Sequence, residues 1–239
     1  MRNFLSHLLF SLILLPFFSL TLLAAFPDST KTYVFFPKPQ PVNKFNLSLG
    51  VSMTVIPRAI VQEGVIPLPM LEVRTKYGLS DHFFLTGQAN IVYVTNQVSL
   101  GIGWADSYKG ISFAIADNFG YWFGFADFEG FDAVAMGLTN YPSLTVGAQV
   151  DDLSISLRSE VLLSISQHTS FGTSSVGRIN PQLAGVAFTL GIEQPLWKDN
   201  SILFGTRIQY ALPMYQTWLA FSTFHRWLIF PEFFIGYEL

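Results

Sequence analysis

The chain has 239 residues, half of them apolar, and only 12% carry a charged side chain, whereas an ordinary soluble domain carries about 25%. The net charge of −3 and the lack of any basic run give no electrostatic support for binding nucleic acid. The chain contains no Cys, which excludes disulfides and thiolate metal sites, and its 24 Phe are hard to keep soluble unless lipid covers them.

Residues 1–25 have the pattern of a secretory signal peptide. Arg2 supplies a positive start, the stretch from Leu5 to Leu23 is overwhelmingly apolar, and Ala24 and Ala25 are small residues suited to cleavage near Phe26. The sequence therefore predicts an exported protein with a cleaved signal peptide, and an uncleaved membrane anchor is the alternative.

Residues 26–43 form a Pro-rich segment in which Pro37, Pro39 and Pro41 alternate with other residues. Such spacing favours an extended backbone without internal hydrogen bonds. We expect a linker here, with Tyr33 to Phe36 packing on the rim of the domain that follows.

From Lys44 to Ile56 nearly every second residue is apolar, as in Leu49, Val51 and Met53. Successive side chains of a strand point to opposite faces, so this segment is a ribbon with one apolar and one polar face. The same rhythm recurs to the C-terminus without a domain boundary, which predicts a single all-β domain over residues 44–239. Prolines fall near the proposed strand ends, where a missing amide donor does least harm.

The chain resembles bacterial outer-membrane β-barrel proteins. The resemblance rests on the alternation, on a short turn at 77–81, and on a last strand, 233–239, that alternates aromatic residues and ends the chain. It implies a transmembrane antiparallel up-and-down barrel of about 12 strands, with about 10 as the alternative. It also implies location in the outer membrane, contact with outer-membrane lipids, and recognition of the last strand by the barrel-insertion machinery.

Two other architectures and one internal conflict remain open at this point. A helical membrane protein and a soluble β-sandwich both compete with the barrel. With 12 strands counted from a periplasmic N-terminus, the stretch from Gln167 to Pro181 falls on the periplasmic side, where turns are expected to be short. We expect its Ser, Thr and Gly residues to form an exposed, mobile loop.

In such a barrel, the charged residues on the polar face point into the lumen. We interpret them mainly as a mutual ion-pair network, with Arg74, Arg158 and Arg207 as candidates to select anions. Small lumen residues, such as Gly191 and Gly205, leave space for water or allow a tight barrel to close. The predicted lumen charge cluster is Glu72, Arg74, Lys76, Arg158, Glu160, Glu193 and Arg207, with Glu232 and Glu238 on the same face.

The segment from Phe119 to Phe131 is unusually aromatic and predicts an interfacial girdle, with a stacking platform for a ligand as the alternative. The predicted girdle residues are Phe119, Tyr121, Trp122, Phe123 and Phe125. Asp127, Glu129 and Asp132 lie nearby, but they lack the spacing of a calcium loop, so we predict no metal and no cofactor.

The function predicted from the sequence is a passive pore for small solutes, or a structural or surface-binding barrel, without enzymatic activity. The alternative is a lipid-modifying barrel enzyme, either a hydrolase or an acyltransferase. That alternative needs a nucleophile beside a base, and the candidates are His168 among neighbouring Ser residues, with Glu160 upstream, and His225.

Overall fold

The computed structural model describes residues 32–60, 66–93, 95–128, 131–179, 181–196, 200–212 and 226–239. The predicted signal peptide, His225 and Glu129 lie outside these residues. In the described ranges, no helix has both the length and the apolar character needed to cross a bilayer. The regular elements are the strands β1 (Phe45–Ile56), β2 (Ile66–Gly78), β3 (Phe83–Ile91), β4 (Thr95–Tyr108), β5 (Ile111–Phe128), β6 (Phe131–Val150), β7 (Leu153–Phe171), β8 (Ser174–Ile179), β9 (Gln182–Pro195), β10 (Ser201–Ala211) and β11 (Leu228–Glu238).

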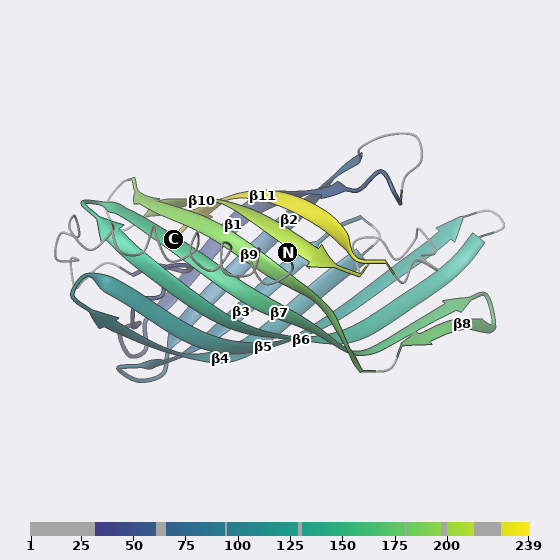
Figure 1. The fold of residues 1–239 in the computed structure, drawn as a ribbon, viewed down its shortest axis with the longest axis horizontal. Helices are drawn as coiled ribbons and strands as arrows, with labels where there is room; N and C mark the ends of the chain where they lie inside the picture. Colours follow the sequence, from purple (N-terminus) through teal and green to yellow (C-terminus); the bar gives the residue numbers. More distant parts are fainter. Residues whose placement is uncertain are drawn as a thin grey trace, which may run out of the picture.

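The strands form a closed antiparallel ring (Figure 1). Neighbours along the chain pair in order from β1 to β7, then β7 pairs with β9, β9 with β10, and β10 with β11. The ring closes where β1 pairs with β11, from Ser48 opposite Glu238 to Thr54 opposite Glu232. This arrangement confirms the predicted up-and-down barrel and excludes a helical membrane fold.

The eleventh strand, β8, does not add a position to the ring. It pairs with the end of β7, where Gln167 lies opposite Ile179, and β9 continues along the same edge of β7 with Ser164 opposite Gln182. Pro181 lies between β8 and β9, and a proline cannot donate a ladder hydrogen bond. The ring therefore has ten positions, which confirms the alternative strand number.

The preferred number of about 12 strands was wrong because it assumed membrane strands of about 9–11 residues each. Strands β5, β6 and β7 have 18, 20 and 19 residues, nearly twice that length. Residues 111–150 therefore contain two long strands.

The two ends of the barrel differ. At one end, which we call the short-turn end, the connections are 79–82, 109–110 and 151–152. Lys109 and Gly110 both have positive φ, at 51° and 81°, as a two-residue type I′ hairpin requires. The C-terminus also lies at this end, and the β7–β8 hairpin lies at the opposite, long-strand end (Figure 1).

The ten-position ring also removes the conflict at residues 167–181. These residues are not an irregular loop: they form the end of β7, a turn at Gly172 and Thr173, and then β8. Strand β1 begins at the short-turn end, and seven ring strands, β1 to β7, precede the hairpin turn. An odd number of crossings places that turn at the long-strand end.

The wall sorts its side chains as the alternation predicts. On β1, Leu49, Val51 and Met53 are exposed on the outside, whereas Ser48 and Thr54 are buried inside. The contrast recurs around the ring, where Leu100 is 68% exposed and Glu193 only 1%. A soluble β-sandwich has the reverse arrangement, with its apolar side chains in the centre.

Candidate functional site

The N-terminal segment enters the barrel. Residues 32–40, which we call the plug segment, precede β1, and Tyr33, Phe35 and Phe36 are almost completely buried. Phe36 has no exposed surface at all. We expected Tyr33 to Phe36 to pack on the rim of the barrel, but their contacts place them within the lumen.

Two charged side chains of the wall hold the plug backbone. The two carboxylate oxygens of Glu193 accept hydrogen bonds from the N–H groups of Phe35 and Phe36, at 2.7 and 2.6 Å. From β2, the Lys76 ammonium donates to the carbonyl oxygens of Phe36 and Lys38, at 2.9 and 3.0 Å. Since the plug segment lies outside every strand ladder, these bonds satisfy backbone groups that would otherwise be buried without partners.

The Phe35 ring lies between two arginines of the wall. The guanidinium carbons of Arg74 and Arg158 lie 5.3 and 4.2 Å from its centroid, within the range of cation–π attraction. A Cβ atom built on Gly191 would collide with this ring, and one on Gly147 would collide with Phe36 and Pro37. These two glycines therefore admit the plug, and side chains of the plug fill the space that they leave.

All seven residues of the predicted charge cluster lie on the lumen side of the wall, but they do not form one network. Arg74 pairs with Glu72 at 2.8 Å, and Arg207 pairs with Glu160 at 3.2 Å. Glu193 and Lys76 bind the plug backbone instead. Arg158 donates from Nε to the Thr145 hydroxyl at 3.1 Å and stacks on Phe35.

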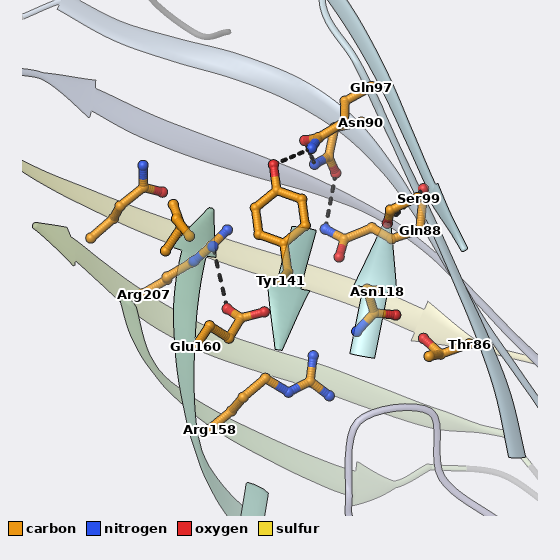
Figure 2. A pocket seen from close by; sticks show the side chains of 12 residues that line it. Thr86, Gln88, Asn90, Gln97, Ser99, Asn118, Tyr141, Arg158, Glu160 and Arg207 are labelled. Carbon is orange, nitrogen blue, oxygen red and sulfur yellow. Dashed lines mark hydrogen bonds and ion pairs between the residues drawn. The ribbon is translucent and has the colours of Figure 1, made fainter. Parts of the chain in front are cut away.

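Between the plug and the long-strand end lies a polar cavity that we call the mid-lumen pocket (Figure 2). It encloses about 530 Å³ of space between atoms, part of which is open to solvent. Its lining is Thr86, Gln88, Asn90, Gln97, Ser99, Asn118, Tyr141, Arg158, Glu160, Leu162, Arg207 and Gln209.

A chain of amide hydrogen bonds runs along one wall of this pocket. Gln88 donates to Glu72 and to Asn90, at 2.7 and 3.1 Å, and Gln97 donates to the Tyr141 hydroxyl at 2.5 Å. These amides were not among the site residues predicted from the sequence. The sequence feature that could have identified them is the alternation of β3 and β4, which places these amides on the polar face of both strands. Amide side chains that face the lumen from neighbouring strands lie within hydrogen-bonding reach of one another.

Beyond the pocket, the interior becomes apolar toward the long-strand end. Met70, Trp122 and Leu162 form one buried cluster there with several alanines. Trp122 was wrongly grouped with the outer girdle: it is 2% exposed and packs against Gly137 inside the barrel. The reason is the two-residue period, which turns Trp122 inward between its neighbours Tyr121 and Phe123.

The other four predicted girdle residues are exposed on the outer face of β5, and these are Phe119, Tyr121, Phe123 and Phe125. They form one aromatic row along a single strand. Whether they lie at a membrane interface stays a prediction.

The structure does not bring together the residues considered for catalysis or for metal binding. His168 is exposed near the end of β7, whereas Glu160 is paired with Arg207 inside the lumen. Asp127 and Asp132 lie opposite each other on β5 and β6. Within the described ranges, no group of three His, Cys, Asp or Glu side chains is arranged to hold a metal ion.

A closed antiparallel barrel with an apolar outside and a polar inside has the architecture of outer-membrane β-barrel proteins. The sequence matches no family model and no curated protein. Among solved structures it is similar to neisserial surface protein A, with 10% identity, 82% of this chain and 96% of that chain covered, and a TM-score of 0.39.

Two further structures show comparable similarity. The translocator domain of the autotransporter NalP from Neisseria meningitidis has 10% identity, with 81% of this chain and 87% of that chain covered and a TM-score of 0.43. The attachment invasion locus protein Ail of Yersinia pestis, solved with the heparin analogue sucrose octasulfate, has 11% identity, 82% and 97% coverage, and a TM-score of 0.27.

Proposed function

We propose that this chain is a bacterial outer-membrane barrel whose own N-terminal segment closes the lumen, so that it acts as a binding barrel and not as an open diffusion pore. The apolar outer face supports contact with membrane lipids, since exposed Leu, Ile and Phe side chains surround the wall. In this orientation the short-turn end faces the periplasm, and the long strands β5 to β7 project outward from the cell. Strand β11 is the element that the insertion machinery would recognise.

The binding of the plug to Glu193 carries this proposal. A segment that merely passed near the barrel would not bury Phe36 completely or place two consecutive backbone N–H groups on one carboxylate. Contacts from β2, β7 and β9 reach the plug from different parts of the wall. The plug therefore fills the cross-section where an open pore would need water.

Planar-bilayer recordings test the closed lumen. We expect the full chain to insert without a steady ion conductance, and a variant in which residues 32–40 are replaced by Gly and Ser at the same length to conduct. Val42→Ser is the matched control, because Val42 is 48% exposed and outside the plug, and it should stay closed. A steady conductance in the unmodified chain would overturn the proposal.

A further inference from the structure

We propose that the mid-lumen pocket binds a small hydroxylated oxyanion, a carboxylate or a phosphate, with Arg158 as its anchor. This inference rests on the proposed function, because the Phe35 ring of the plug stacks on Arg158 and orients it. It assigns a class of ligand to the proposed binding barrel.

Arg158 differs from the two other lumen arginines. Arg74 and Arg207 each pair with a glutamate. Among the residues that the structure describes, Arg158 forms no ion pair, since Glu160, the acidic side chain that acts on it most, is paired with Arg207. Its Nε donates to the Thr145 hydroxyl, and its flat face lies on the Phe35 ring. In Figure 2 its guanidinium points into the pocket, and no dashed line reaches it.

Arg158 is part-buried and has no paired carboxylate, so an anion beside it would offset some of the desolvation of its guanidinium. The outer edge of a guanidinium offers parallel N–H donors that match the two oxygens of a carboxylate or phosphate. Stacking on Phe35 and the bond to Thr145 fix the plane of this donor fork. The outer edge of Arg158 therefore suits an oxyanion that enters the pocket.

Two uncharged polar groups lie around the same point. Thr86 from β3, Asn118 from β5 and Arg158 from β7 line both the mid-lumen pocket and a second cavity beside the plug. Within the described part of the chain, the Thr86 hydroxyl and the Asn118 side-chain amide make no hydrogen bond, and both are drawn without a dashed line in Figure 2. These groups suit the hydroxyls of a ligand whose charged end lies on Arg158.

Calorimetry on the full chain in detergent micelles tests the site with sodium gluconate, inorganic phosphate and the neutral polyol glucitol. We expect gluconate or phosphate to bind and glucitol not to bind, with the tighter anion identifying the preferred head group. Arg158→Gln should weaken that binding at least about tenfold, because hydrogen bonds to charged groups contribute this much. Asn118→Ala should weaken gluconate binding more than phosphate binding.

Arg58→Gln is the matched control. It makes the same substitution at an arginine that is exposed and lines neither cavity, so anion affinity should be retained. No binding of either anion to the folded chain, or an unchanged affinity in Arg158→Gln, would refute the inference. The bilayer recordings are independent of this result, so failure of the anion site and failure of the closed lumen are distinguishable.

Discussion

Glu193 illustrates how single lumen residues determine the state of this barrel. A carboxylate on the inner face of a strand is expected to pair with a cation or to line a water-filled channel. Glu193 instead accepts hydrogen bonds from two neighbouring backbone N–H groups that lie 158 and 157 residues earlier in the chain. Its role is therefore to bind the plug, and the sequence alone could not reveal this because nothing local links Glu193 to Phe35.

Asp117 is an acidic residue exposed on the apolar outer face of β5. The side-chain amide of Asn140 donates a hydrogen bond to it at 2.5 Å. We expect Asn140→Leu to lower the free energy of unfolding by about 1–3 kcal/mol, because it leaves the acceptor without its donor. Urea titration of the barrel in lipid vesicles measures this change.

The matched control for Asn140→Leu is the double variant with Asp117→Leu. Removing both polar partners should restore most of the lost stability, since replacing a complete hydrogen-bonded pair by apolar groups is nearly neutral. If the double variant were less stable than Asn140→Leu alone, the pair would have another role.

At the scale of elements, the wall was predictable and the plug was not. Alternation identified β1 and the polar and apolar faces of the other strands, because the two-residue period is a local property of each segment. The long strands β5 and β6 were not resolved as two elements, since residues 119–128 are aromatic on both faces and hide the period. The spacing of Pro37, Pro39 and Pro41 predicts an extended linker, but it carries no signal for what surrounds that segment in the fold.

The seven charged residues of the lumen also show which features of the candidate site the sequence predicts and which it does not. Their common face followed from the alternation, whereas their partners did not, since pairing depends on register between strands distant in sequence. Arg207 on β10 meets Glu160 on β7 over the intervening strand β9, and Glu72 meets Arg74 two residues away on the same strand.

The fit of the plug to Gly191 gives a prediction at this scale. A side chain at Gly191 would occupy the position of the Phe35 ring, so Gly191→Val should displace the plug and produce a steady ion conductance in planar bilayers. Gly87→Val is the matched control, because Gly87 is also a strand glycine but faces the side chains of Thr75 and Leu100. A closed Gly191→Val barrel would show that the plug does not depend on this contact.

At the scale of the whole molecule, the barrel has three layers along its axis. The plug fills the short-turn end, the mid-lumen pocket follows, and the apolar cluster around Trp122 lies toward the long-strand end. The pairing of β1 with β11 closes the ring around these layers. In this pairing, Glu232 and Glu238 of the last strand lie opposite Thr54 and Ser48 of the first strand. The plug, the mid-lumen pocket and the apolar cluster follow one another along the barrel axis.

The position of the plug can be measured directly with single cysteines, because the native chain contains none. Val34 is 8% exposed inside the barrel and Val42 is 48% exposed outside the plug. We predict that Val34→Cys in the folded barrel reacts with a membrane-impermeant maleimide at least about tenfold more slowly than Val42→Cys, because burial restricts access to the thiolate, and that the two react equally in denaturant. Equal rates in the folded barrel would show that the N-terminal segment does not lie within the lumen.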